Sequence, residues 1–236
     1  MFKVVKLKYV LIAIIILATA IVVPFLVKEN TTATIKASPS IGVTIVLDAG
    51  HGGVDPGSVG RKTKITESEL NLAIVLKLKD YLLTGGINCI LTRKDNSGLY
   101  GEYSKDYKKR DMEARKKIIE TSNAELVISI HMNSFTSSRY RGAQVFYSEI
   151  NPESEKLASL IQSCFASDLA ESNKGSSIAD YYMLKCSSLP SVLCECGFLS
   201  NQEDEALLVT PEYQDKVAYS IYKGIVSYLC VGSKQI

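Results

Sequence analysis

Two histidines are the only imidazoles in this sequence of 236 residues, and each follows a short apolar run. His51 comes soon after Thr44-Ile-Val-Leu47, and His131 directly follows Val127-Ile-Ser-Ile130. Buried strands of a parallel sheet read as apolar runs, and the ligands of such sheets lie beyond the carboxyl ends of their strands. Neutral imidazole is a favoured zinc ligand. We therefore expect His51 and His131 to converge at one sheet edge and to bind a metal ion there.

A catalytic zinc site needs a third protein ligand and an open position for water. Glu67 is our candidate, because it opens the helix that is expected after the glycine-rich loop of His51. Asp48 and Asp55 in the same loop compete for this role. The residue pattern alone leaves the choice open.

Glu195 interrupts the apolar run that begins at Val192-Leu193-Cys194. A buried carboxylate without a partner costs several kcal/mol, so its presence in an apolar strand indicates a cation or a functional site. Hydrolysis also requires a group that takes a proton from the attacking water and passes it to the leaving group. We predict that Glu195 is this catalytic carboxylate.

Apolar strands alternate with amphipathic helices along the chain, which predicts an α/β fold. We expect a mostly parallel, twisted sheet of about six strands with helices on both faces. The expected strands are 44–47, 87–91, 126–130, 143–147, 182–184 and 191–196. The first expected helix begins after Thr66, which forms a capping box with Glu69. Further helices are expected at 110–121, at 151–170, in a short stretch after Ser200, and at 210–229.

The N-terminus carries Lys3, Lys6 and Lys8, followed by an apolar run over 10–27. A run of this length is long enough to cross a bilayer as a helix. We predict a signal anchor or signal peptide at 1–27, and favour the anchor because the run continues past the A-x-A-like site at 18–20. A flexible tether at 28–41 and a catalytic domain at 42–232 follow. The positive-inside rule places that domain outside the cytoplasmic membrane.

Charge and cysteine content exclude several classes of protein. Residues 1–41 contain five of the 27 basic residues and one of the 25 acidic residues. Residues 42–236 therefore carry 22 basic and 24 acidic side chains, a slight excess of negative charge. A nucleic-acid-binding domain would carry a basic footprint instead. The six cysteines have neither C-x-x-C spacing nor a regular pattern, so we interpret most of them as small buried hydrophobic residues and not as a disulfide framework or zinc finger.

Six segments together resemble the zinc-dependent N-acetylmuramoyl-L-alanine amidases, in the order in which that family has them. They are Leu47–Gly57, Thr66–Leu72, Leu91–Arg93, Ile128–Ser134, Gly142–Tyr147 and Val192–Asn201. The resemblance spans about residues 43–230 and implies one zinc ion per chain. It implies that His51, Glu67 and His131 bind the zinc and that Glu195 is the catalytic carboxylate.

The resemblance implies hydrolysis of the amide between N-acetylmuramic acid and L-alanine in peptidoglycan. In this reaction we expect Asn133 to orient the substrate and Arg141 to pair with a stem-peptide carboxylate. Within the family, the chain is most similar to the germination-specific members of spore formers, which trim stem peptides so that cortex muramic-δ-lactam can form. This similarity implies a location between the forespore membranes.

Two alternatives of other classes remain open. A zinc peptidase that cuts within the stem peptide would use the same metal chemistry. A non-catalytic wall-binding module would need no carboxylate at position 195, so Glu195 argues against it. The lack of wall-binding repeats in the sequence suggests an activating or tethering protein partner.

Overall fold

The computed structural model describes residues 42–232. The predicted membrane segment at 1–27 and the tether at 28–41 lie outside this range. Within the described part of the chain, no helix combines the length and apolar character that a membrane crossing requires.

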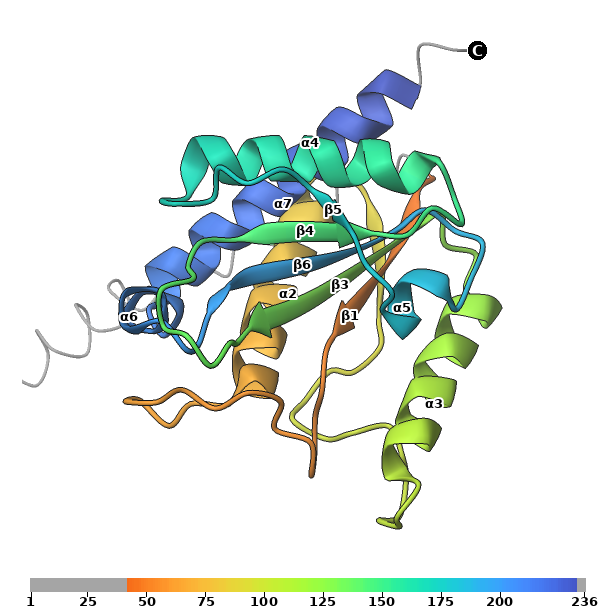
Figure 1. The fold of residues 1–236 in the computed structure, drawn as a ribbon. Helices are drawn as coiled ribbons and strands as arrows, with labels where there is room; N and C mark the ends of the chain where they lie inside the picture. The colour runs from red at the N-terminus through yellow and green to blue at the C-terminus, as the bar shows by residue number, and fades with distance from the viewer. Residues whose placement is uncertain (1–41, 233–236) are drawn as a thin grey trace, which may run out of the picture. The chain divides into compact units, whose positions relative to one another are not determined.

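A six-stranded sheet with the order β2-β1-β3-β6-β4-β5 forms the centre of the domain (Figure 1). Its strands are β1 (Thr44–Ala49), β2 (Asn88–Leu91), β3 (Leu126–Asn133), β4 (Gln144–Tyr147), β5 (Ser177–Ile178) and β6 (Ser191–Phe198). All neighbouring pairs are parallel except β4 and β6, which are antiparallel. The prediction of an α/β fold with about six strands is confirmed, and the sheet is mixed.

The direction of β4 follows from the chain that precedes it. Residues 134–143 connect β3 to β4 and contain no helix. A parallel return within one sheet needs a crossover of a dozen or more residues, usually a helix. The chain therefore turns back, and β4 runs antiparallel beside β6.

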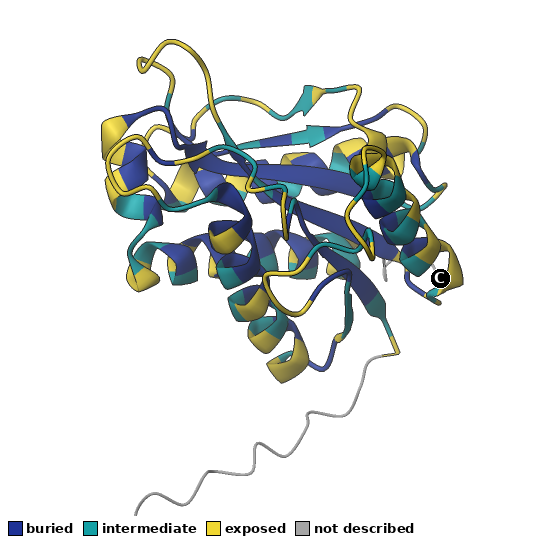
Figure 2. Cartoon of the chain, turned by 90° about the horizontal axis from the view of Figure 1, so that it is seen from below, coloured by how far each residue is buried: buried dark blue, intermediate teal, exposed yellow. Residues whose placement is uncertain are grey.

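Helices cover both faces of the sheet (Figure 1). One face packs against α2 (Glu67–Thr84), α4 (Glu153–Asp168) and α7 (Pro211–Gly232). The other packs against α3 (Tyr107–Thr121) and α5 (Tyr182–Lys185), while the short α6 (Gln202–Leu208) follows β6. Figure 2 shows the buried strands between these layers.

The two faces of the sheet differ in polarity near the carboxyl ends of the strands. Side chains of a strand alternate between faces, so Ile128 and Ile130 of β3 enter the larger core beneath α2, α4 and α7. Val127 packs on the opposite face against α3 and α5. Ser129 and His131 follow Val127 at intervals of two and share its face. The α3 and α5 side of the sheet therefore carries the polar residues.

One predicted strand is wrong. Residues 182–184 belong to α5, a single helical turn in which the backbone N–H of Leu184 donates to the Tyr181 carbonyl at 3.1 Å. Met183 and Leu184 are both buried, which adjacent residues of a one-sided strand cannot be. The edge strand lies earlier, at Ser177–Ile178.

Another local prediction is confirmed: Thr66 and Glu69 form both hydrogen bonds of the capping box that starts α2. The prediction that most cysteines are buried holds for three of the six. Cys186, Cys194 and Cys196 are buried, whereas Cys89 and Cys164 are half-buried and Cys230 is exposed. The apolar strand pattern around Cys194 and Cys196 explains their burial, because it places them in the core as small hydrophobic residues.

Candidate active site

Two buried arginines hold the loop that follows β1. Arg115 of α3 donates to the carbonyl oxygens of Ala49 at 2.8 Å and His51 at 2.6 Å. Arg93 donates to the carbonyls of Ala49 at 2.8 Å and Gly50 at 3.0 Å. His51 itself has a φ of 63°, a left-handed conformation that is uncommon for residues other than glycine. The arginines thus keep the His51 backbone in a strained position.

Asp48 belongs to this structural network. Its carboxylate accepts from Arg115 Nη1 and Ser129 Oγ, both at 2.6 Å, and from Thr92 Oγ1 at 2.8 Å. Burial disfavours the charged form, yet Arg115 and Ser129 hold the pKa of Asp48 below its ordinary value. Its oxygens are therefore committed to this network, which removes Asp48 as a metal ligand.

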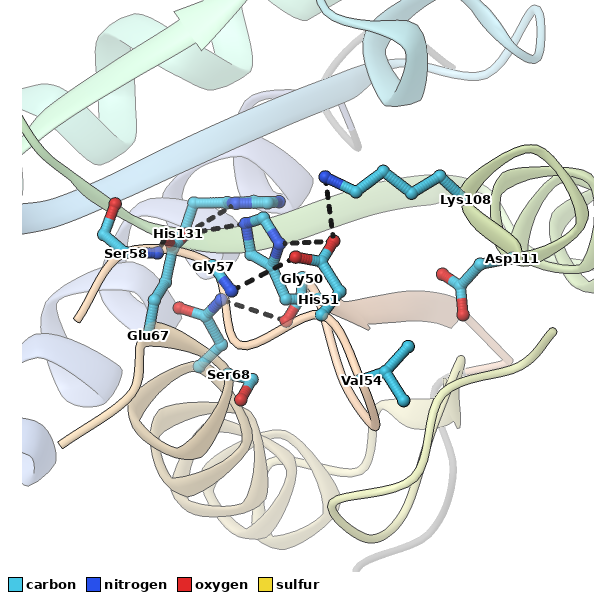
Figure 3. Close-up of polar contacts among 12 residues, drawn as sticks. Gly50, His51, Val54, Gly57, Ser58, Glu67, Ser68, Lys108, Asp111 and His131 are labelled. Atoms are coloured by element: carbon cyan, nitrogen blue, oxygen red, sulfur yellow. Dashed lines mark hydrogen bonds and ion pairs between the residues drawn. The ribbon is translucent and has the colours of Figure 1, made fainter. Parts of the chain in front are cut away.

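Glu67 lies between the two histidines (Figure 3). Its Oε1 atom is 3.1 Å from His51 Nε2 and 3.0 Å from His131 Nδ1. One ligand atom from each residue lies within 4.8 Å of the others, so the three could hold a metal ion. The backbone N–H groups of Ser58 and Met132 donate to the same carboxylate at 2.8 and 3.1 Å and orient it.

Asp55 contacts the other side of the His51 ring. Its Oδ2 atom is 3.0 Å from His51 Nδ1, and Lys108 Nζ of α3 lies 3.8 Å from the same oxygen. A carboxylate on the second nitrogen of a histidine orients the ring and leaves the first nitrogen free for a metal. The geometry thus selects Glu67 for the central position and gives Asp55 an outer role.

The charged groups of the site shift the pKa values of their neighbours. Burial alone would lower the pKa of His51, but Glu67 and Asp55 raise it to about 9. Burial alone would raise the pKa of Glu67, but His131 and His51 hold it well below its usual range. Glu67 is therefore ionised at neutral pH, as a metal ligand must be.

Two glycines leave room for the imidazole of His131 and the carboxylate of Glu67. A Cβ atom on Gly50 would lie 2.2 Å from His131 Cε1, and one on Gly57 would lie 2.6 Å from Glu67 Oε2. Side chains at these two positions would displace the imidazole or the carboxylate. Two imidazole nitrogens and a carboxylate oxygen are a zinc donor set of the catalytic kind, so the residues present fit this metal.

Glu195 stands apart from these three residues. It is the register partner of His131 on the neighbouring strand β6, and its side chain shares the polar face. It is 7% exposed, and its Oε2 atom has no hydrogen-bond partner in the described part of the protein. Burial raises the pKa of Glu195 to about 7, against the opposing effect of His131. A carboxyl with such a pKa can both accept and return a proton near neutral pH.

Both strands are longer than expected. β3 continues to Asn133 and so includes His131, which was expected to lie beyond its end, and β6 extends past residue 196 to Phe198. The β3–β6 register shifts between His131 and Asn133. The predicted convergence of the histidines is confirmed, with ring centroids 5.0 Å apart, but His131 is held by a strand and not by a loop.

An open cavity of about 510 Å³ joins these groups. His51, Glu67, His131 and Glu195 line it together with Asn133. The Asn133 Oδ1 atom accepts from the backbone N–H of Ser134 at 2.8 Å, which is a turn-capping contact.

Arg141 is not among the residues that line this cavity. It pairs with Glu203, and its Nε lies 3.5 Å from Asp204 Oδ1. Its predicted contact with substrate remains a prediction.

Sequence reasoning missed Arg115 and Tyr181. Arg115 follows Asp111 by four residues and reads as one half of an ordinary surface ion pair on a helix. The side chain of Arg115 is completely buried, and no pattern in the surrounding sequence indicates this burial. Tyr181, which also lines the cavity, lies in a segment that was expected to lead into a strand.

Comparison with known proteins agrees with this geometry. The profile of the N-acetylmuramoyl-L-alanine amidase family matches residues 45–227. The chain belongs to this family. As an amidase it shares 42% identity over 194 residues with the germination-specific N-acetylmuramoyl-L-alanine amidase of Bacillus subtilis, an alignment that covers 80% of this chain and 81% of the relative.

Solved amidase structures have the same fold. The CwlD amidase from Clostridioides difficile, determined in complex with the GerS lipoprotein, has a TM-score of 0.76 and 42% identity, and covers 80% of this chain and 99% of that chain. The catalytic domain of the amidase CwlV from Paenibacillus polymyxa has a TM-score of 0.70 and 32% identity, and covers 80% of this chain and 99% of that one. The expected amidase activity on peptidoglycan is therefore confirmed at the level of the family.

Proposed function

We propose that this amidase hydrolyses the bond between N-acetylmuramic acid and L-alanine with one zinc ion held by His51, Glu67 and His131. The observation that carries the proposal is the position of Glu67 Oε1, which is 3.1 Å from His51 Nε2 and 3.0 Å from His131 Nδ1. When bound, zinc supplies a Lewis acid that polarises a carbonyl and lowers the pKa of water.

Glu195 carries the proton transfers. Its carboxylate accepts a proton from the attacking water and returns it to the departing nitrogen of L-alanine. The C–N bond then breaks with a neutral amine as the leaving group and not an amide anion. The pKa of about 7 suits both steps near neutral pH. Asn133 lies on the cavity wall, where we propose that its amide orients the substrate. Arg141 is proposed to meet a stem-peptide carboxylate, in competition with Glu203 and Asp204.

A role in spore cortex formation is the finer part of the proposal. It is supported by the 42% identity to the germination-specific amidase of Bacillus subtilis. In this role the enzyme removes stem peptides before muramic-δ-lactam is made. The related CwlD amidase was solved with a lipoprotein, which supports a protein partner for this chain as well. We propose that residues 1–27 anchor the catalytic domain outside the cytoplasmic membrane, between the two membranes of the forespore.

Mass spectrometry of digested muropeptides tests the reaction. The full chain is treated with a chelator, dialysed, and assayed after addition of zinc or magnesium. We expect zinc alone to restore release of free stem peptides that begin with L-alanine, with N-acetylmuramic acid left intact. Fragments cut within the stem peptide would favour the peptidase alternative, and binding without any cleavage would favour a wall-binding module.

The cortex role needs a separate test. Spores from a strain without this enzyme should contain no muramic-δ-lactam in their cortex, and the wild-type chain should restore it. A variant that carries Glu195→Gln is the matched control, because it keeps the fold but lacks the proton acceptor. Normal lactam content in the deletion strain would contradict the cortex role while leaving the amidase reaction intact.

A further inference from the structure

Tyr181 forms a wall of the active-site cavity that the mechanism above does not use. It follows the edge strand β5 and directly precedes α5. The segment that contains it passes over the sheet face that carries Glu195 (Figure 1). Tyr181 lines the same cavity as His131 and Glu195 and is 40% exposed.

A contact with β4 fixes the ring of Tyr181. Its ring meets that of Phe146 edge to face, with centroids 5.8 Å apart and planes at 89°. Phe146 pairs in register with Leu193, and Glu195 lies two residues further along β6. Leu193 also lines the cavity, so Tyr181, Leu193 and Glu195 form one continuous wall.

The phenol of Tyr181 is available to a ligand. Within residues 42–232 its hydroxyl makes no hydrogen bond, and the charges that act on it are those of Glu195 and Glu67. Burial raises the pKa of Tyr181, and the nearby charges of Glu195 and Glu67 raise it further, so the group is a neutral hydrogen-bond donor at every pH at which the enzyme would work. The adjacent Tyr182 is equally exposed, at 44%, but does not line the cavity.

The order of the strands places these groups in a row. His51 follows β1, His131 lies on β3, Glu195 lies on β6, and Tyr181 rests on Phe146 of β4. Neighbouring strands are about 4.8 Å apart, so Glu195 separates the histidine side of the cavity from the tyrosine side. In the proposed mechanism the metal would be held on the histidine side, and water would attack from there. The amine that receives the proton from Glu195, and the residue attached to it, would then lie toward Tyr181.

We propose that Tyr181 forms the leaving-group subsite and donates its phenolic hydrogen bond to the peptide carbonyl of the stem-peptide L-alanine. This inference rests on the proposed cleavage between N-acetylmuramic acid and L-alanine. It makes Tyr181 a substrate-binding residue that recognises the peptide and not the sugar.

Product inhibition tests the inference, because the two products report on the two sides of the cavity. L-alanyl-D-glutamate and N-acetylmuramic acid are used as inhibitors of the zinc-loaded full chain and of two variants. We expect Tyr181→Phe to weaken inhibition by the dipeptide by about 5- to 10-fold, the value of one neutral hydrogen bond. Inhibition by N-acetylmuramic acid, zinc content and thermal stability should stay unchanged, since Phe retains the ring contact with Phe146.

Tyr182→Phe is the matched control and should change neither inhibition constant. Unchanged dipeptide inhibition in Tyr181→Phe would overturn the proposal, as would equal weakening of both inhibitors or a lack of dipeptide inhibition in the unmodified enzyme. Failure of the proposed function is recognised separately, because the unmodified enzyme would then release fragments cut at another bond.

Discussion

Replacing Glu195 by Gln should slow hydrolysis strongly and, at alkaline pH, stabilise the chelator-treated protein. The carboxyl has a pKa of about 7 in the folded protein, against 4.5 for an ordinary glutamate. The folded protein therefore keeps a proton that the unfolded chain releases between these values. Because the unfolded state binds fewer protons, the free energy of unfolding falls as pH rises through this window.

The magnitude follows from the difference between the two pKa values. Each pKa unit corresponds to about 1.4 kcal/mol, so the penalty reaches about 3 kcal/mol once the folded carboxyl is ionised. It is mostly absent at pH 5 and nearly complete at pH 8. Gln does not titrate and avoids the penalty. We expect the stability advantage of Glu195→Gln over the wild type to grow by about 2–3 kcal/mol between pH 5 and pH 8.

Urea unfolding of chelator-treated protein at the two pH values measures this change. Glu149→Gln is the matched control, because Glu149 is an exposed glutamate of the same domain. In the zinc-loaded protein, Glu195→Gln should keep stoichiometric zinc and lose about 10²–10⁴-fold in rate. A stability difference that is the same at pH 5 and pH 8 would refute the buried-carboxyl argument, and full activity would refute the role in proton transfer.

Four further outcomes are expected. His51→Ala and His131→Ala should each lose bound zinc and all activity, and one equivalent of zinc in either dialysed variant would rule out that ligand. Glu67→Gln should lower both the zinc affinity and the rate, whereas Glu195→Gln should lower the rate alone; metal titration of the two variants measures this difference. Arg115→Met should lower the free energy of unfolding by about 3–5 kcal/mol in urea, since it leaves two buried carboxylates unpaired. A reporter fused after residue 41 should be active only outside the cytoplasm, and cytoplasmic activity would contradict the anchor prediction.

Local patterns were sufficient to predict most of the elements. The apolar runs before His51 and His131 identify buried strands because strands of a sheet that is covered on both faces consist mostly of apolar residues. The capping box of Thr66 and Glu69 marks the start of α2 because both hydrogen bonds form within four residues. The position of Glu195 in an apolar run predicted a buried carboxylate, and the residue is 7% exposed. These signals depend only on near neighbours in the chain.

Other features depend on packing between distant segments. The sequence of Tyr182–Lys185 fits a strand as well as a helix. The segment forms a helical turn because this conformation buries both Met183 and Leu184. The partner of β4 is β6, a strand that follows it much later in the chain. Arg115 is buried because Asp48 and the carbonyl of His51 lie where α3 crosses the loop. No property of the helix sequence around Arg115 reveals these partners.

Which carboxylate lies between the two imidazoles was likewise decided by the tertiary structure. Asp48, Asp55 and Glu67 are all carboxylates close to His51 in the sequence, and spacing does not rank them. Packing turns Asp48 toward Arg115 and places Asp55 on the outer nitrogen of His51. It brings the first turn of α2 to the end of β3, so that Glu67 faces both imidazoles. The sequence by itself determined which residue types could bind a metal, whereas the directions in which their side chains point depend on how α2, α3 and the sheet pack together.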